Sequence, residues 1–353
     1  MNFDFNQSEQ TFLKELDTLL KGINCKNIDV NELLKELAKT DYLKIEISPF
    51  LMAAMEILSS YTQSLFLSIE VSTRIFGRII SNFGNDNQKQ TILPGLFDGK
   101  LIGAVALSED SMNIDNEPLK TKGYREDDFI IVNGNKSYVV NAGIADYFAV
   151  AGRIDDKDAI FLIEKGTNGL SVSDRLHTIG YDGTSISNLS LKDCKINETN
   201  VLYPKLSAIR MWENQVLIGA TLGMMKASFE SAKNYAKTHK TGGKPIIAYQ
   251  EIGFKLAEML TTLQTSQLFA YRSCWLYGIG DKEADIVTYS AKVFCGESAE
   301  KVASDALQIL SGAGVLCGNP AEEAYRCSKY AQIAGTSTEI SRVKIGDAAL
   351  GRL

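Results

Sequence analysis

The chain has 353 residues, of which 45% are hydrophobic and 23% are charged, values typical of a globular protein with more than one subdomain. Its net charge of −6 leaves no excess of lysine and arginine to neutralise phosphates, which argues against a nucleic-acid partner. The sequence contains no apolar run of about eighteen residues, so we expect no membrane span. The acidic, amphipathic start does not resemble a secretory signal, so we expect a cytoplasmic protein.

Cysteine and histidine are too few and too scattered to indicate a metal centre. The six cysteines form no CxxC pair, and only two histidines are present. We therefore expect reduced, structural thiols, no metal site and no histidine-dependent catalytic triad.

The part of the chain before residue 204 divides into a helical region and a β-rich region. In residues 1–100, apolar side chains recur at three- and four-residue spacing, which predicts an N-terminal helical domain. Residues 101–203 contain short β-type runs separated by turn residues, which predicts a central β-domain, either a barrel or a sandwich. Asn133 and Gly134 lie between two such runs, a pattern typical of a hairpin turn. Neither strand–helix–strand alternation nor a GxGxxG motif indicates a Rossmann unit.

The remaining residues, 204–353, return to a helical pattern. Glycine-containing breaks separate four long segments, which predicts a C-terminal four-helix bundle and an α+β fold class for the whole chain. The expected helices span Ala208–His239, Gln250–Gly278, Ala284–Gly312 and Glu322–Leu353.

Four motifs add a specific resemblance to this domain order. ALSED (106–110) is similar to A-L-T-E-P-x-x-G-S-D, and NGNKSYVVNAGIAD (133–146) is similar to N-G-x-K-x-W-I-T-N-x-x-x-A-D. AYQEIGFKLAEML (248–260) and the stretch from QILSGAG (308–314) to GTSTEISR (335–342) match two further motifs of the same family. Together they make the chain resemble the acyl-CoA dehydrogenases, which have the same order of helical, β and bundle domains.

The resemblance implies FAD as the cofactor, with several altered contacts. Tyr138 replaces a tryptophan, Val140 replaces a threonine, and His239 replaces an arginine that reaches the FAD of a neighbouring subunit. Ile114 occupies the position of a serine that contacts CoA. Each lost hydrogen bond costs on the order of 1 kcal/mol, so we expect weaker FAD binding than is usual for the family. The matching cofactor positions are Leu107, Ser108, Tyr138, Val140, His239, Gln250, Gln308, Gly312 and Thr336.

The catalytic carboxylate of the family is absent from its usual place. In the family, FAD takes a hydride from the β-carbon of an acyl thioester while a carboxylate removes the α-proton. The usual carboxylate precedes Gly-Thr, but Ala334 stands there and offers only its backbone amide to polarise the thioester carbonyl. In isovaleryl-CoA dehydrogenase the base lies on another helix, and the matching position here is Glu213, ten residues before Gly223. We interpret Glu213 as a relocated base, and the alternative is a solvated charge near a helix N-terminus.

The resemblance thus implies an FAD-dependent dehydrogenase that oxidises the Cα–Cβ bond of an acyl thioester. The acyl group is carried either by CoA or by a carrier protein, and the electron acceptor is an electron-transfer flavoprotein or oxygen. We expect a homodimer or tetramer. Two alternatives stay open: a catalytically silent structural or regulatory subunit of a mixed hetero-oligomer, and a flavin monooxygenase on the same fold.

Overall fold

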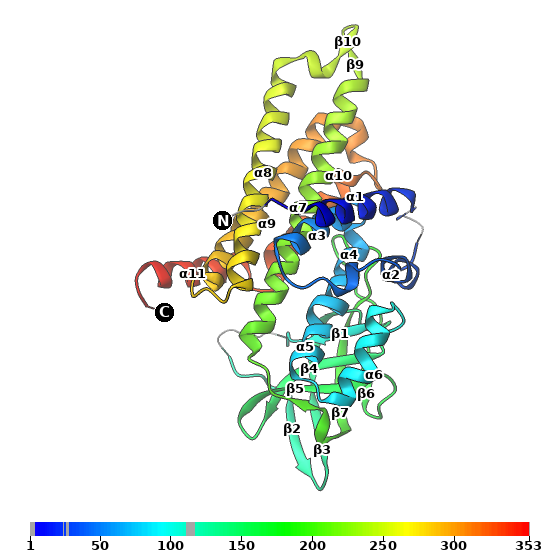
Figure 1. Ribbon diagram of the computed structural model, residues 1–353, viewed down its shortest axis with the longest axis vertical. Coiled ribbons are helices and arrows are strands. Elements are labelled where there is room, and N and C mark those ends of the chain that lie inside the picture. Colours follow the sequence, from blue (N-terminus) through cyan, green and yellow to red (C-terminus); the bar gives the residue numbers. More distant parts are fainter. Residues whose placement is uncertain (1–3, 24, 26–27, 111–116, 353) are drawn as a thin grey trace.

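Helices occupy one end of the molecule and a β-sheet the other, with the N-terminal helices packed beside the junction (Figure 1). The computed structural model describes residues 4–23, 25, 28–110 and 117–352. One continuous hydrophobic core runs through the N-terminal helices, the sheet and the C-terminal bundle. The three regions therefore meet over buried apolar surface rather than across loops.

The N-terminal region is helical, as expected. Its helices begin at polar N-caps, and both Asn6 and Asn85 form capping boxes that satisfy the first free backbone N–H groups. A π-helical turn, η2 (Val71–Phe76), interrupts the helical run beside the sheet. The elements are α1 (Gln7–Gly22), α2 (Val30–Ala38), η1 (Tyr42–Lys44), α3 (Pro49–Tyr61), α4 (Gln63–Glu70), η2, α5 (Gly77–Phe83) and α6 (Asp86–Phe97).

The central region forms one eight-stranded sheet within the described residues. Its strand order is β6-β7-β3-β2-β4-β5-β8, and β1 pairs in parallel with β4. The strands are β1 (Gly103–Ala106), β2 (Lys122–Glu126), β3 (Phe129–Val140), β4 (Tyr147–Ile154), β5 (Lys157–Glu164), β6 (Leu170–Val172), β7 (Ile186–Asn197) and β8 (Val201–Leu202).

The hairpin expected at Asn133 and Gly134 is wrong. Both residues lie inside the single long strand β3, where the pairing with β7 shifts register between Val132 and Gly134. A Cβ at Gly134 would lie 2.4 Å from Oγ1 of Thr121, so the close approach of Thr121, which directly precedes β2, requires glycine there. The reversal lies at the β2–β3 connection instead, where Asp127 has a positive φ of 54°.

The C-terminal region is a helical bundle whose first three helices lie close to their expected positions. They are α7 (Leu206–Thr238), α8 (Gln250–Gly278) and α9 (Ala284–Leu310). Between α7 and α8 lie the small strands β9 (Lys240–Thr241) and β10 (Lys244–Pro245) and the turn η4 (Ile246–Ala248), and η5 (Ser311–Val315) follows α9.

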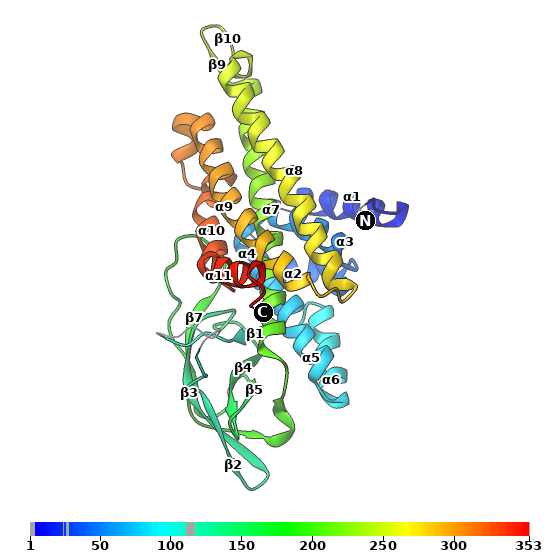
Figure 2. The same cartoon turned by 90° about the vertical axis from the view of Figure 1, so that its left-hand side faces the viewer.

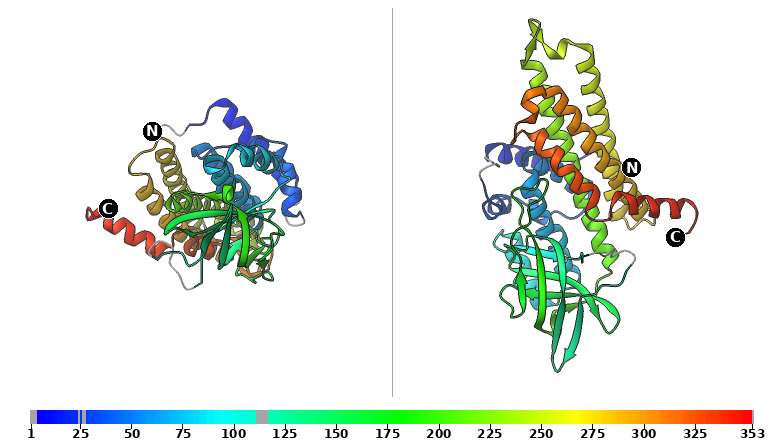
Figure 3. Two further views of the ribbon diagram at one scale, coloured as in Figure 1. Left: turned by 90° about the horizontal axis from the view of Figure 1, so that it is seen from below. Right: turned by 180° about the vertical axis from the view of Figure 1, so that it is seen from behind.

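The expected fourth helix, Glu322–Leu353, is instead two helices. α10 (Pro320–Ile333) ends before Gly335, which has a positive φ of 67°, and α11 (Thr338–Ala349) begins at the N-cap Ser337. α11 turns away from the bundle axis and packs against α9 (Figure 3). The break places a short loop, Ala334–Ser337, beside α7 and α9.

Three observations bear on membranes, metals and thiols. No helix in the described part of the chain combines the length and apolarity needed to cross a bilayer. The described residues contain no group of three or more potential metal ligands among His, Cys, Asp and Glu. All six cysteines carry free thiols.

Candidate active site

A cavity lies where α4, the π turn, β1, β3, α7 and α10 meet. It brings together residues that are more than 100 positions apart in the chain, including five of the expected site residues. Its remaining walls are mostly apolar. The expected residues in it are Leu107, Ser108, Tyr138, Val140 and Glu213, and the apolar walls come from Leu67, Val71, Ile75, Val105, Val216 and Leu217.

A β-bulge in β3 presents Tyr138 to this cavity. The pairing of β3 with β7 shifts between Lys136 and Val139, and Tyr138 has a left-handed φ of 59°. This conformation costs a tyrosine about 1–2 kcal/mol. It is held by a 3.1 Å hydrogen bond from the Tyr138 N–H to Oδ1 of Asn188, and the ring is 63% exposed at the cavity rim. Backbone strain of this kind is concentrated at functional sites.

A buried ion pair braces the strand end that carries Leu107 and Ser108. The Lys136 ammonium donates to Oε1 of Glu109 at 2.7 Å and to the Leu107 carbonyl at 3.2 Å. Burial lowers the pKa of Lys136 to about 8, and Glu109 opposes this shift. Burial by itself would raise the pKa of Glu109, but hydrogen bonds from Lys136 and Thr121 outweigh it and lower that pKa. The pair therefore holds one wall of the cavity in place.

Glu213 faces the cavity from the first part of α7. Val216 and Leu217, three and four residues further along the helix, line the same cavity, so the helix face that carries them also carries Glu213. The Glu213 side chain is 23% exposed and forms an ion pair with Arg210, whose side chain is only 6% exposed. Arg210 was not among the expected site residues, although its spacing from Glu213 on a helix is a usable signal for an ion pair.

In the loop after α10, the backbone amide of Ala334, which was expected to be available to a thioester, already has a hydrogen-bond partner. The Ala334 N–H donates to the Tyr330 carbonyl at 2.8 Å and so closes the last turn of α10. That the Ala334 N–H polarises a thioester carbonyl stays a prediction. For this role the N–H must either share or release its hydrogen bond to Tyr330. Thr336 is fully buried, and its N–H donates at 2.9 Å to Oδ1 of Asn214, the residue next to Glu213.

The other expected cofactor residues lie outside the cavity. His239, Gln250, Gln308 and Gly312 are exposed, and they belong to the end of the bundle that carries the β9–β10 hairpin, opposite the sheet (Figures 1 and 2). His239 ends α7 and stacks on Tyr235, with ring centroids 4.6 Å apart. A single chain therefore does not unite the two halves of the expected FAD site. Ile114, the expected CoA-contacting position, lies outside the described residues.

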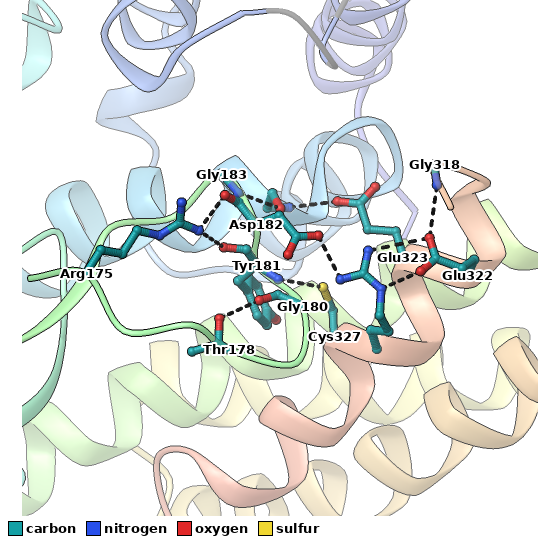
Figure 4. Close-up of polar contacts among 12 residues, drawn as sticks. Arg175, Thr178, Gly180, Tyr181, Asp182, Gly183, Gly318, Glu322, Glu323 and Cys327 are labelled. Atoms are coloured by element: carbon teal, nitrogen blue, oxygen red, sulfur yellow. Dashed lines mark hydrogen bonds and ion pairs between the residues drawn. The ribbon is translucent and has the colours of Figure 1, made fainter. Parts of the chain in front are cut away.

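A second cluster of polar contacts joins the loop before β7 to α10 (Figure 4). The ring of Tyr181 packs on that of Tyr330, which lines the cavity, at a centroid distance of 4.9 Å. The Tyr181 N–H donates to Sγ of Cys327 at 3.3 Å, and Asp182 forms a 2.7 Å ion pair with Arg326. These contacts fasten the loop before β7 to α10 and fix the position of Tyr330.

Comparison with known proteins agrees with this architecture. The sequence model of the acyl-CoA dehydrogenase middle domain matches residues 104–194, and that of the C-terminal domain matches residues 211–350. An acyl-CoA dehydrogenase of Bacillus subtilis (strain 168) is 30% identical over 320 residues, which cover 87% of this chain and 83% of the relative. The mitochondrial isovaleryl-CoA dehydrogenase of Solanum tuberosum is 31% identical over 308 residues, which cover 83% and 74%.

Solved structures establish the fold. The prolyl acyl carrier protein oxidase AnaB has a TM-score of 0.89 and 23% identity, covering 98% of this chain and 100% of that one. A glutaryl-CoA dehydrogenase from Mycobacterium smegmatis in complex with FADH2 has a TM-score of 0.90 and 20% identity, covering 98% and 95%. The chain belongs to the acyl-CoA dehydrogenase family, whose members are flavin-dependent oxidoreductases that act on CH–CH groups.

Proposed function

We propose that the chain is an FAD-dependent dehydrogenase that oxidises the Cα–Cβ bond of an acyl thioester, with Glu213 as the base. The observation that carries this proposal is that Glu213 lines the same cavity as Leu107, Ser108, Tyr138 and Val140. The base position and the positions matching flavin contacts come from different domains, yet they meet at one site. This convergence favours a catalytic role for Glu213 over that of a solvated surface charge.

The residues around the cavity fit the flavin end of FAD. The Ser108 hydroxyl offers a hydrogen-bonding group, and the exposed Tyr138 ring offers an aromatic face at the rim. Leu107 and Val140 add apolar surface to the wall of the cavity. FAD, when bound, supplies the acceptor for the hydride that leaves the β-carbon. Thr336, whose N–H donates to Asn214, does not line the cavity itself.

The remaining half of the FAD site fits an oligomer. His239, Gln250, Gln308 and Gly312 are exposed at the far end of the bundle, so they can serve an FAD molecule only if it belongs to another subunit. This arrangement supports the proposal of a homodimer or tetramer. A mixed oligomer satisfies the same geometry if the partner chain provides an equivalent surface.

The chain's own groups can carry out the proton transfer. An α-C–H bond of a thioester is a weak acid, so its base must be close and shielded from water. Val216 and Leu217 provide an apolar surface next to the Glu213 carboxylate, and Arg210 holds that carboxylate by an ion pair. The α-proton passes to an Oε atom of Glu213, while the electron pair of the breaking C–H bond forms the new Cα=Cβ bond as hydride leaves the β-carbon.

The substrate proposed is an aliphatic acyl thioester, since the cavity walls from α4, the π turn and α7 are apolar. The acyl group is carried either by CoA or by the phosphopantetheine arm of a carrier protein. The structural similarity to AnaB, a prolyl acyl carrier protein oxidase, supports considering a carrier protein. The electron acceptor is proposed to be an electron-transfer flavoprotein or oxygen.

The absorbance spectrum of the purified protein tests the proposal. We expect a flavin spectrum that bleaches under anaerobic conditions when acyl-CoA or acyl-carrier thioesters are added. A colourless protein that takes up FAD only with a second chain would point to the silent-subunit alternative. Oxygen consumption with reduced flavin, without thioester oxidation, would point to the monooxygenase.

A further inference from the structure

The side chain of Lys292 on α9 is buried without a carboxylate as its hydrogen-bond partner. It is 2% exposed, and its ammonium donates to two backbone carbonyls, those of Ala331 at 2.9 Å and Thr336 at 2.8 Å. Ala331 lies near the end of α10, and Thr336 lies just before α11. A single side chain thus joins the two ends of the loop that separates these helices.

This placement costs stability. Removing an ammonium group from water is unfavourable unless an opposite charge or several good hydrogen bonds compensate. Burial lowers the pKa of Lys292 to about 8, and the charge of Glu213 only partly offsets this. A hydrophobic side chain at this position would avoid the cost, so packing alone does not account for a lysine here.

The loop that Lys292 holds is fastened from three helices. Asn214 on α7 accepts from the Thr336 N–H at 2.9 Å and donates to the Thr336 hydroxyl at 3.1 Å. Ser341 on α11 donates to the Thr336 carbonyl at 3.3 Å. Gly335 is left-handed, and a Cβ there would lie 2.5 Å from Oδ1 of Asn214. The loop therefore has little freedom to move while these contacts persist.

The loop also touches the walls of the cavity. The Ala334 N–H bonds to the carbonyl of Tyr330, and a Cβ on Gly335 would lie 3.0 Å from Leu217. Tyr330 and Leu217 both line the cavity together with Glu213. A shift of the loop would consequently move groups that face the proposed flavin and thioester.

We propose that Lys292 is a positioning residue of the candidate active site, which with Asn214 clamps the loop Ala334–Thr336 against the turn of α7 that carries Glu213. The inference rests on the proposed function, because the loop matters only if the cavity holds flavin and substrate. It assigns a site role to a residue on a helix that contributes nothing to the cavity lining itself.

The substitution Lys292→Met tests this role in the full-length, FAD-loaded protein. It removes the lysine donor from the Ala331 and Thr336 carbonyls, leaves Ser341 as the remaining side-chain donor to Thr336, and loosens the loop. We expect the FAD dissociation constant to rise about tenfold and the rate constant for flavin bleaching by an acyl thioester to fall by about the same factor. The midpoint of thermal unfolding should stay close to that of the wild type, because removal of the buried charge offsets the loss of its two hydrogen bonds to backbone carbonyls.

A matched control and a second variant separate positioning from general damage. Lys301→Met removes an exposed lysine from the same helix and should leave FAD affinity and the visible circular dichroism of bound flavin unchanged. Asn214→Leu removes the clamp from the opposite side and should shift the flavin dichroism in the same direction as Lys292→Met. The inference is overturned if Lys292→Met binds FAD with the wild-type constant and the wild-type flavin dichroism.

Hydrogen exchange keeps this inference distinct from the proposed function. Faster amide exchange in residues 331–337 of Lys292→Met, relative to wild type and Lys301→Met, is the result expected whether or not FAD is present. A wild-type protein that binds no FAD and oxidises no thioester would refute the proposed function, and with it the site role of Lys292. Unchanged exchange in these residues would refute the clamp alone.

Discussion

Replacing Glu213 with glutamine separates its proposed chemical role from its structural one. The amide has nearly the same size as the carboxylate, but it accepts no proton from a substrate. General-base catalysis contributes about 10²–10⁴-fold to rates, so the rate constant for flavin bleaching should fall by that factor, about 3–5 kcal/mol in activation free energy. FAD binding should be unchanged, because the carboxylate is not expected to contact the cofactor.

The structural cost of the same substitution is expected to be smaller. Glu213 forms its ion pair with Arg210, and its side chain is 23% exposed, so solvent already weakens that pair. The glutamine carbonyl can still accept a hydrogen bond from Arg210, which limits the loss of folding free energy to about 1 kcal/mol. In a chain of 353 residues, a loss of this size lowers the unfolding midpoint by only about 1–2 °C. The kinetic effect should therefore exceed the stability effect several-fold.

Anaerobic stopped-flow measurement of flavin bleaching gives the decisive result. Wild type and Glu213→Gln are loaded with FAD, checked for identical flavin spectra, and mixed with the thioester that bleaches the wild type best. Arg210→Met serves as the comparison, since it loosens the carboxylate without removing it, and we expect about a tenfold loss. Bleaching of Glu213→Gln at the wild-type rate would refute the assignment, because the base would then lie elsewhere.

Three further predictions concern stability. Gly335→Ala places a Cβ 2.5 Å from Oδ1 of Asn214 in a left-handed conformation, so urea unfolding should show a loss of at least about 1–2 kcal/mol, and no loss would contradict the backbone assignment. Burial lowers the pKa of Lys292 to about 8 in the folded state, below its ordinary value of 10.5. The unfolded state therefore binds more protons between these two pH values, so the free energy of unfolding should rise from pH 8 to 10.5 in the wild type but less so in Lys292→Met. Lys136→Met leaves the buried Glu109 carboxylate unpaired and should cost about 3–5 kcal/mol in the same urea assay, whereas a loss below about 1 kcal/mol would show that the pair is not needed.

Helices with regular apolar spacing and clear breaks were predictable from the sequence. The bounds expected for α8, Gln250–Gly278, agree with the structure, because a long amphipathic pattern there ends at a glycine-rich turn. Predictions from local patterns were wrong where contacts with residues distant in the sequence determine the backbone conformation. Gly134 has the pattern of a hairpin residue, yet it lies inside β3 with Thr121 packed against it. The expected fourth helix of the bundle breaks near Gly335, which packs against Asn214.

For the candidate site, too, the sequence predicted some features and only the tertiary structure revealed the others. Motifs along the chain predicted Glu213 as the base and four further cavity residues as flavin contacts, because each residue type stands at a defined place in a local pattern. The structure brings these five residues into one cavity, and their roles there are the ones we propose. Long-range contacts could not be inferred in this way: Asn214 bonds to Thr336 across 122 residues, and Lys292 reaches the same residue across 44. Local spacing determines which chemical groups a helix or strand offers. Only the packing of α7, α9 and the loop after α10 decides which backbone groups those side chains hold, since hydrogen bonds depend on the distances that tertiary structure creates.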